Sequence, residues 1–416
     1  MKLFLLGIST CALIFSGCTN TTSNAPQIST YNASKKAPIV KNEKSTLYYP
    51  GSMTQSTIEK KVIIAPKQQE ESIITAMATP TPQTSVESSA IVEEPVRTLS
   101  HKALESNGLM IKIAVLVPQK TIRKYAITSV NSVMSFLLYK NYAFDLNVFN
   151  CNDETPSAIM TTLTDIRAGG YHYVIAPMTA DGAQILADNV KDMVVFIPTL
   201  TRQSVKNADS NIVFGGINYE EQLSLLATYS NEKVGTFEDG SSLSFQLNDY
   251  VKRTVPHLFY EKQIANSKVN FKQLFKGNTS LNNGSFYLNT PLVTTSLIAS
   301  QLRANGINPH ALLSTQINYN PLLLNLTQYE DRDNLFIANS IQQAPTELEE
   351  INALFGHNIV YDWVNYATSI GADYLCTNFY ETPNGRVFQE QIENNQVHYN
   401  TAIYKPERSS FVKIVP

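Results

Sequence analysis

Cys18 is the first residue in this chain whose type and position suggest chemistry. It follows a basic start at Met1-Lys2 and an almost wholly apolar run over residues 3–16. That run is too short to span a membrane as a helix, and it is typical of a secretory signal. Small residues at Ser16 and Gly17 stand where cleavage needs them. We therefore expect residues 1–17 to be a signal peptide.

The segment Ile14-Phe15-Ser16-Gly17-Cys18 resembles the lipobox of bacterial lipoproteins. The resemblance implies that the Cys18 thiol is acylated. Thr19, rather than Asp, follows the cysteine, which by resemblance implies the periplasmic face of the outer membrane, with the inner membrane as the alternative. Three acyl chains would anchor the protein firmly, because each buried CH₂ contributes about 0.8 kcal/mol. The other interpretation is an ordinary signal peptide that contains a cysteine.

The rest of the sequence carries no catalytic or metal-binding motif. Nucleophile-elbow, Walker-type, dinucleotide-binding and His-Glu-x-x-His patterns do not occur, and the six His residues have no metal spacing. We therefore predict a protein that is not an enzyme and holds no cofactor or metal. Cys151 and Cys376 are predicted to be unpaired, although the periplasm permits a disulfide. The formal net charge of −3 provides no basic field for nucleic acid.

Residues 18–107 differ in composition from the remainder of the chain. They are rich in Ser, Thr, Asn, Gln, Lys and Glu, and their apolar runs, such as Val-Ile-Ile-Ala at 62–65, are short and isolated. Such runs bury too little area to offset the entropy lost when the backbone is ordered. We predict a disordered tether with an r.m.s. span of roughly 50 Å. A small domain or docking helices, with residues 73–78 as a partner-binding motif, are the alternative.

From residue 108 onward, apolar strands alternate with amphipathic helices. The first series predicts strands at 111–118, 144–149, 173–177, 193–198 and 212–214, and helices at 125–140, from 155, 182–190 and 219–229. The second predicts strands at 233–237, 257–260, 285–289, 311–314 and 335–338, helices at 243–252, 294–303, 345–355 and 361–370, and an extended tail over 374–415. This alternation favours an α/β fold of two lobes, each an open, mostly parallel sheet with helices on both faces.

Six short segments carry a family resemblance across this body: 113–118 (IAVLVP), 174–179 (VIAPMT), 196–199 (FIPT), 312–315 (LLST), 361–364 (YDWV) and 385–389 (GRVFQ). Residues 108–416 resemble the type I periplasmic binding-protein fold, which leucine-binding proteins share with the activators of penicillin-binding proteins. On this resemblance we place the first lobe at about 108–229 plus 345–370. The second lobe is predicted to comprise about residues 230–344 plus 371–416.

Open α/β sheets bind ligands outside the carboxyl ends of their strands, which in two lobes face each other. The candidate cleft residues at these ends are Gln119, Lys120, Asp153, Thr179, Thr199, Thr201, Arg202, Asp239 and Ser241. Solvated loop charges, helix caps and turn caps are the alternative roles for these residues.

In amino-acid-binding members of the family, a Gly-Pro-x-x-Ser turn supplies a hydroxyl to the ligand carboxylate. The corresponding run here, 176–180, places Ala180 at the Ser position with Thr179 beside it. Thr199 and Thr201 match the Ser/Thr pair that the family uses after the fourth strand. An aromatic residue that the family places in the second lobe is missing from 238–242. The resemblance thus implies that the fold is retained, whereas some of the residues that bind amino acids in the family are missing.

Two functions follow from these observations. The first is a tethered head that binds a protein partner in the cell envelope, possible roles being activation of peptidoglycan synthesis or support of an envelope assembly. The second is binding of a small, amino-acid-like solute between the lobes, for transport or sensing. A hydrolase is the weakest hypothesis, because the sequence offers no nucleophile and base to assign.

Overall fold

The computed structural model describes residues 99–101, 110–264, 269–380 and 385–414, all within the compact unit Ser89–Pro416. The predicted signal peptide, Cys18 and most of the predicted tether lie outside the described residues. Among the residues that are described, no helix combines the length and the apolar character that crossing a membrane requires.

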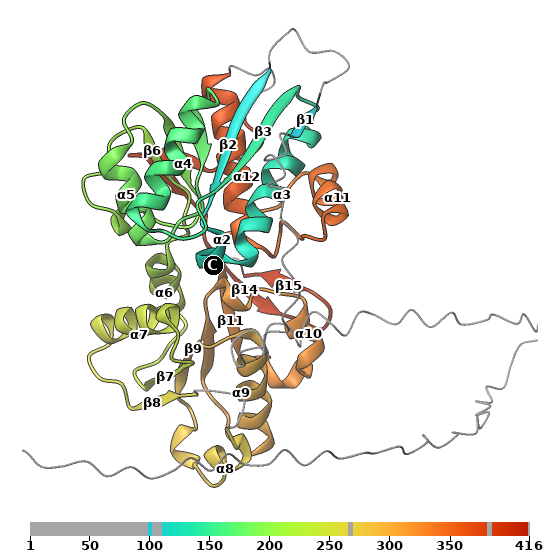
Figure 1. Cartoon of the computed structure of the whole chain (residues 1–416). Helices are drawn as coiled ribbons and strands as arrows, with labels where there is room; N and C mark the ends of the chain where they lie inside the picture. The colour runs from blue at the N-terminus through green and yellow to red at the C-terminus, as the bar shows by residue number, and fades with distance from the viewer. Residues whose placement is uncertain (1–98, 102–109, 265–268, 381–384, 415–416) are drawn as a thin grey trace, which may run out of the picture. The chain divides into compact units, whose positions relative to one another are not determined.

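An eight-stranded sheet forms the centre of the first lobe (Figure 1). Neighbouring strands from β3 to β13 run parallel, whereas β1 and β12 pair antiparallel at the two edges. In spatial order the strands are β1 (Leu99–His101), β3 (Phe144–Asn150), β2 (Ile111–Val117), β4 (Tyr173–Ile175), β5 (Val194–Ile197), β6 (Ile212–Phe214), β13 (Gln396–His398) and β12 (Gln391–Glu393). The Ile- and Val-rich strand β2 is buried almost throughout, as expected where helices cover both faces of a parallel sheet.

A seven-stranded sheet forms the centre of the second lobe. Its strands from β11 to β8 are parallel, and β14 and β15 complete one side in antiparallel fashion. In spatial order they are β15 (Phe411–Lys413), β14 (Ala402–Pro406), β11 (Leu335–Asn339), β10 (Ala311–Ser314), β9 (Ser285–Asn289), β7 (Val234–Glu238) and β8 (Tyr260–Gln263).

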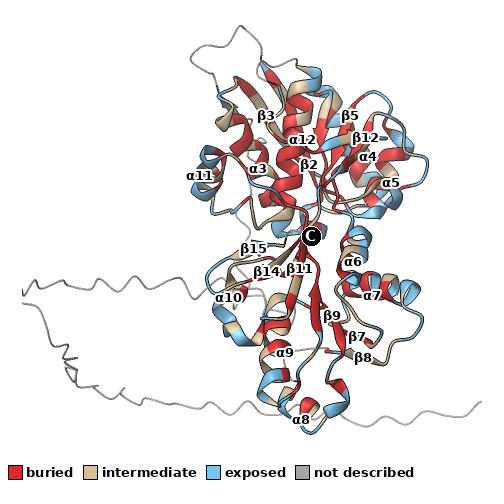
Figure 2. Ribbon diagram, turned by 180° about the vertical axis from the view of Figure 1, so that it is seen from behind, coloured by how far each residue is buried: buried red, intermediate tan, exposed pale blue. Residues whose placement is uncertain are grey.

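Helices cover both faces of each sheet, and Figure 2 shows the buried residues concentrated along the sheets and the inward sides of the helices. In the first lobe, α3, α11 and α12 contribute to one core and α4 and α5 to the other. The bounds are α2 (Gln119–Ile122), α3 (Lys124–Tyr139), α4 (Pro156–Ala168), α5 (Ala180–Asn189), η1 (Arg202–Ser204), α11 (Thr346–Leu354) and α12 (Trp363–Phe379).

In the second lobe, α8, α9 and α10 contribute to one core and α6 and α7 to the other. The bounds are α6 (Tyr219–Ala227), α7 (Ser242–Thr254), α8 (Phe271–Phe275), η2 (Thr279–Leu281), α9 (Leu292–Ala304), η3 (Gln316–Asn318), α10 (Leu322–Leu326) and η4 (Tyr329–Asp331). The predicted α/β architecture of two lobes, each with a mostly parallel sheet, is confirmed.

Strand β1 lies inside the stretch that was predicted to be an unstructured tether. Leu99 pairs with Leu146 and His101 with Phe144 in antiparallel register. Without β1, the backbone groups of β3 would form an open sheet edge, which is a site for unwanted pairing. A strand of three residues is too short for a hydrophobic period to reveal it.

The lobe boundaries differ from the predicted ones at two places. Helix α6 was assigned to the first lobe, but its residues Leu223 and Leu226 are buried in a core of the second lobe. Residues 371–416 were assigned to the second lobe, but α12 continues to Phe379 and both β12 and β13 belong to the first sheet. Gly371 lets α12 lie directly on β5, because a Cβ added there would sit 2.3 Å from the Phe196 ring.

The chain passes between the lobes three times: from β6 to α6, from β11 to α11 and from β13 to β14. The Tyr399 hydroxyl donates to the Gly215 carbonyl (2.5 Å), and the hydroxyls of Ser340 and Thr401 lie 2.9 Å apart. The Gln222 amide donates to the Ser340 hydroxyl (2.7 Å). The three crossings therefore lie side by side and are tied by mostly buried hydrogen bonds.

An aromatic bridge joins the lobes on one side of these crossings. Tyr361, from the loop between α11 and α12, places its ring centroid 5.3 Å from Tyr319 and 6.3 Å from Phe411. Tyr319 in turn lies 4.4 Å from Phe411 and 5.1 Å from Tyr404, all in the second lobe. Aromatic pairs at such distances contribute about 0.5–1.5 kcal/mol beyond the area they bury. The aromatic bridge (Tyr319, Tyr361, Tyr404 and Phe411) thus holds the lobes together without a ligand.

Candidate functional site

The loops that follow β2 and β3 meet at the carboxyl edge of the first sheet, as predicted for Gln119, Lys120 and Asp153. The Asn150 amide donates to the Gln119 side-chain carbonyl (2.8 Å), and the Lys120 N–H donates to the Asn152 carbonyl (2.7 Å). The Asp153 carboxylate accepts from the N–H and the hydroxyl of Thr155. These hydrogen bonds hold the pKa of Asp153 below its usual range. The Asp153 carboxylate therefore stabilises the turn in which it lies.

Glu154, which was not among the predicted site residues, fills the first turn of α5. Its carboxylate accepts from the Thr179 N–H (2.8 Å), the Thr179 hydroxyl and the Gly182 N–H (3.3 Å). A carboxylate is stabilised at this place by the unsatisfied N–H groups and the helix dipole. Gly182 leaves the necessary room, because a Cβ added there would lie 2.7 Å from the Glu154 carboxyl carbon. The predicted ligand group Thr179 is thus bound to the protein's own carboxylate.

Thr199, Thr201 and Arg202 follow β5, and they too are bonded within the first lobe. The Thr199 hydroxyl donates to the Met178 carbonyl (2.5 Å), which places it beside Thr179. Thr201 precedes η1 and lies 3.3 Å from the Ser204 hydroxyl.

The Arg202 guanidinium holds its own loop together. It donates to the carbonyls of Val205 (2.8 Å) and Ala208 (3.0 Å) and lies over the Phe214 ring. Its donors are therefore committed to these partners rather than turned toward the other lobe.

In the second lobe, Asp239 and Ser241 form the turn that starts α7. The Asp239 carboxylate accepts from the N–H (2.9 Å) and hydroxyl (2.7 Å) of Ser241, whose oxygen caps the Ser244 N–H. Behind them, the Asn248 amide donates to Glu238 (2.8 Å) and accepts from Asn289 (2.6 Å). The alternative role as turn and helix caps therefore describes both predicted residues.

A buried polar network occupies the rest of this edge. The Asn318 amide donates to the Thr290 carbonyl and to the hydroxyls of Thr295 and Ser314 at 2.8–3.1 Å. Gln316 accepts from the Gln222 amide (2.7 Å). Four buried oxygens, on Thr236, Asn289, Thr315 and Asn318, have no hydrogen-bond partner among the described residues. Such groups in a native fold point to ordered water or to a bound polar molecule.

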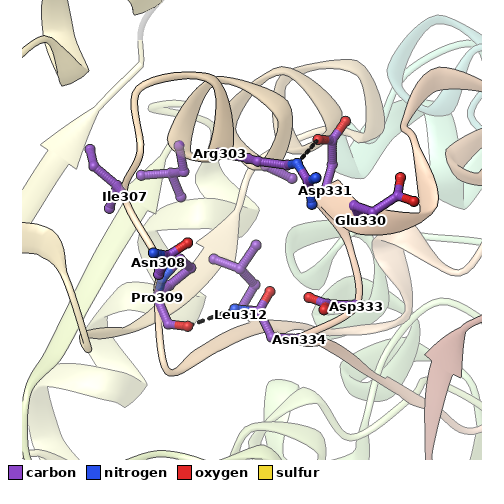
Figure 3. Close-up of a pocket in the computed structure, with 11 residues that line it drawn as sticks. Arg303, Ile307, Asn308, Pro309, Leu312, Glu330, Asp331, Asp333 and Asn334 are labelled. Atoms are coloured by element: carbon purple, nitrogen blue, oxygen red, sulfur yellow. Dashed lines mark hydrogen bonds and ion pairs between the residues drawn. The ribbon is translucent and has the colours of Figure 1, made fainter.

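The described residues also form a pocket of about 320 Å³ at the amino ends of β10 and β11, far along the chain from the predicted cleft residues (Figure 3). Leu302, Ile307 and Leu312 supply its apolar wall, and Arg303 pairs with Asp331 at 3.8 Å. None of the nine predicted cleft residues lines it. Among the described residues no group of three or more His, Cys, Asp or Glu side chains is placed to hold a metal ion.

The two cysteines of the head belong to different cores. Cys151 is buried on the α4 and α5 face of the first sheet and Cys376 on the α12 face, and they form no disulfide with each other, as predicted. Burial raises the pKa of the Cys151 thiol to about 11, so it stays protonated and unreactive at neutral pH.

Comparison with solved structures places this architecture among known folds. LivJ of Streptococcus pneumoniae, a branched-chain amino-acid binding protein solved with isoleucine, matches with a TM-score of 0.51 and 9% identity, over 74% of this chain and 100% of its own. The chain has the type I periplasmic binding-protein fold. A solute-binding protein of Rhodopseudomonas palustris, solved with p-hydroxybenzoic acid, matches with a TM-score of 0.52 and 11% identity, over 73% of this chain and 95% of its own.

Haemophilus influenzae LpoA matches with a TM-score of 0.50 and 10% identity, over 74% of this chain and 60% of its own. No protein-family model and no curated protein matches the sequence. At these identities the likeness establishes the fold alone.

Proposed function

We propose that this protein is a lipoprotein, anchored at the periplasmic face of the outer membrane, whose two-lobed head binds a protein partner in the cell envelope and has no catalytic role. One observation carries the choice of a protein partner over a small solute. The Glu154 carboxylate occupies the hydroxyl and N–H of Thr179, which lies beside Ala180, the position where the family resemblance puts the hydroxyl that binds an amino-acid carboxylate.

The remaining candidate groups support the same conclusion. An α-amino acid needs a donor set for its carboxylate and an acceptor set for its ammonium, since either charge is costly to desolvate unbonded. Arg202 is bound to two backbone carbonyls, and Asp239 to Ser241. Both charged groups are therefore already bonded within their own loops, Arg202 through two guanidinium nitrogens and Asp239 through one carboxylate oxygen.

The predicted tether would allow the head to reach a partner at a distance from the membrane. Cys18 as a lipid anchor and the long polar stretch before the head would carry it away from the membrane and through gaps in the cell wall. The fold that it shares with LpoA supports activation of peptidoglycan synthesis as the finer form of this proposal.

Binding of a small solute is the alternative, and one observation favours it: the four buried, unpaired oxygens of the second lobe. A thermal-shift panel of amino acids, short peptides, aromatic acids and wall fragments separates the two functions. A solute at 100 times its dissociation constant stabilises the fold by about 2.7 kcal/mol. We expect no shift across the panel. A saturable shift with one compound would establish solute binding and overturn the proposal.

The partner itself is tested by photocrosslinking in cells, with the crosslinking residue placed at Ile127 of the first lobe or Phe245 of the second, which are 59% and 54% exposed. We expect a discrete protein adduct from at least one position. The adduct should disappear when residues 25–88, which end before the compact unit that contains β1, are deleted, while the head keeps its melting temperature. Absence of adducts from both positions would contradict a protein partner.

A further inference from the structure

The segment that contains β2, α2 and α3 has an unusual charge distribution. Residues 106–144 include five basic side chains and no Asp or Glu, in a chain whose formal net charge is −3. Lys112 lies at the start of β2, where it is 3.8 Å from the Asp145 carboxylate. Lys120, Arg123 and Lys124 gather after the opposite end of β2.

These three cations form a basic corner (Lys120, Arg123 and Lys124), which has an excess of positive charge. All three side chains are exposed, and none forms an ion pair with a described residue. Two acids compensate part of this charge, because Asp153 interacts electrostatically with Lys120 and Asp362 with Lys124. The remaining excess of positive charge attracts an anionic partner.

The backbone adopts an unusual conformation within the basic corner. Arg123 has φ 50° and ψ −116°, a conformation that residues with a side chain rarely adopt. It separates α2 from α3 and is held by the bond from its N–H to the Gln119 carbonyl (2.8 Å). Such strain persists only where the surrounding structure maintains it, and it is common at binding sites.

Exposed apolar side chains adjoin the corner. Tyr125 and Ile127, in the first turns of α3, are 38% and 59% exposed. Leu354, at the end of α11, is 85% exposed, and His357 just beyond it bonds Asn131, one turn after Ile127. Arginine and aromatic residues, such as Arg123 and Tyr125, are enriched at protein interfaces.

The position of α2 distinguishes a protein partner from a membrane. Figure 1 shows α2 at the junction of the two lobes, directly above the second sheet. A flat bilayer would meet the outer ends of the lobes before it reached their junction, whereas a peptide segment can reach this position. Three cations also attract an anionic membrane only weakly, because each Lys or Arg near the surface adds only a small contribution to the binding free energy.

We propose that the basic corner, with Tyr125, Ile127 and Leu354, is the docking surface for an acidic protein segment that carries aliphatic or aromatic side chains. This inference rests on the proposed function, and it specifies the chemistry of the partner. The acidic residues of that segment pair with Lys120, Arg123 and Lys124, and its apolar residues cover Ile127 and Leu354.

The test selects random 16-residue peptides on the full chain and on the triple variant K120E/R123E/K124E. The matched control is K206E/K272E/K276E, which reverses three exposed lysines that also lack ion pairs with described residues. We expect the natural chain and the control to enrich peptides rich in Asp, Glu and apolar residues. The triple variant should bind those peptides at least about tenfold more weakly, with an unchanged melting temperature, and higher salt should weaken binding to the natural chain.

Three outcomes would overturn the proposal: no enriched peptides, enriched peptides without acidic residues, or equal binding to the triple variant. Tighter binding to vesicles of phosphatidylglycerol and phosphatidylethanolamine than to any peptide, lost in the triple variant, would assign the corner to a membrane instead. The proposed function fails separately. If a protein adduct forms at Phe245 while the basic corner selects nothing, the head has a protein partner that docks elsewhere.

Discussion

The two lobes present equivalent edges of their sheets to each other, yet they satisfy the polar groups at those edges in different ways. The first lobe ends in exposed loops with charged side chains. Glu154 among them binds the first turn of α5, and the basic corner has an excess of positive charge. The second lobe ends in a buried network of neutral amides and hydroxyls around Gln316 and Asn318.

This difference separates two tasks that one fold can perform. The bonds of a buried polar network restrict the arrangement of the groups they join, because each broken bond leaves an unpaired group in a low dielectric. Exposed charges contribute little to stability and are therefore free to change with the partner. We infer that the second lobe supplies rigidity and the first lobe supplies recognition.

The largest expected effect is in the buried network. Asn318→Ala removes an amide that serves three acceptors, so we expect the free energy of unfolding to fall by about 3 kcal/mol. Gln119→Ala, its exposed counterpart in the first lobe, should change it by less than about 0.5 kcal/mol. Urea denaturation of the two variants measures both values. Equal losses would remove the distinction between the lobes.

The aromatic bridge tests whether the lobes are coupled. Tyr361→Ala removes two ring contacts to the second lobe, and we expect a loss of about 2 kcal/mol. Tyr361→Phe keeps the ring and should lose less than about 0.5 kcal/mol. Thermal unfolding by calorimetry should also show a single transition for the natural chain and a broader or split one for Tyr361→Ala. An unaltered transition in Tyr361→Ala would show that the crossings alone couple the lobes.

A smaller effect is expected at Glu154. Glu154→Ala uncovers the first turn of α5, which should cost about 1 kcal/mol. The variant should recover stability in millimolar acetate or glutamate, because a free carboxylate then bonds Thr179 and Gly182. Asp153→Ala is the matched control, since its carboxylate bonds only Thr155. If acetate stabilises the natural chain as much as the variant, Glu154 does not close this site.

The smallest effect concerns an exposed ion pair of the first lobe. Arg167 binds the Asp192 carboxylate through two bonds (2.7 and 2.9 Å) and lowers the pKa of Asp192 to about 2. The folded pKa lies below the unfolded value of about 3.9, so the pair stabilises the fold above that pH and this contribution disappears as the pH falls toward 2. The side chains are 34% and 54% exposed, so we expect less than about 1 kcal/mol. Stability of Asp192→Asn between pH 5 and 2 should have a correspondingly flatter slope than that of the natural chain.

Much of the fold could be predicted because its signals are local. The apolar run at 111–118 and its alternation with the helix after it correspond to β2 and α3 within one or two residues at most ends. Pro156 is at the first turn of α4, as its sequence position indicated. The predicted strand at 257–260 was misplaced, because β8 (Tyr260–Gln263) is an edge strand of alternating burial without a continuous apolar run.

The candidate site was located only in part, because its loops were predictable but their bonds were not. Carboxyl-end loops follow from the order of strands, so Gln119, Asp153, Thr179 and Thr199 were placed at the correct edge. Glu154 was missed although it is adjacent to Asp153. Nothing local shows that its carboxylate reaches Thr179, and only the packing of α4 against α5 brings them together.

The sequence by itself determined most of the longer strands and helices, and that two α/β lobes result, because hydrophobic period and turn chemistry act over a few residues. Tertiary structure alone decided that β12 and β13 return to the first sheet, that Tyr361 reaches the second lobe and that Glu154 fills the first turn of α5. Each of these depends on groups far apart along the chain, whose meeting is set by the packing of whole layers.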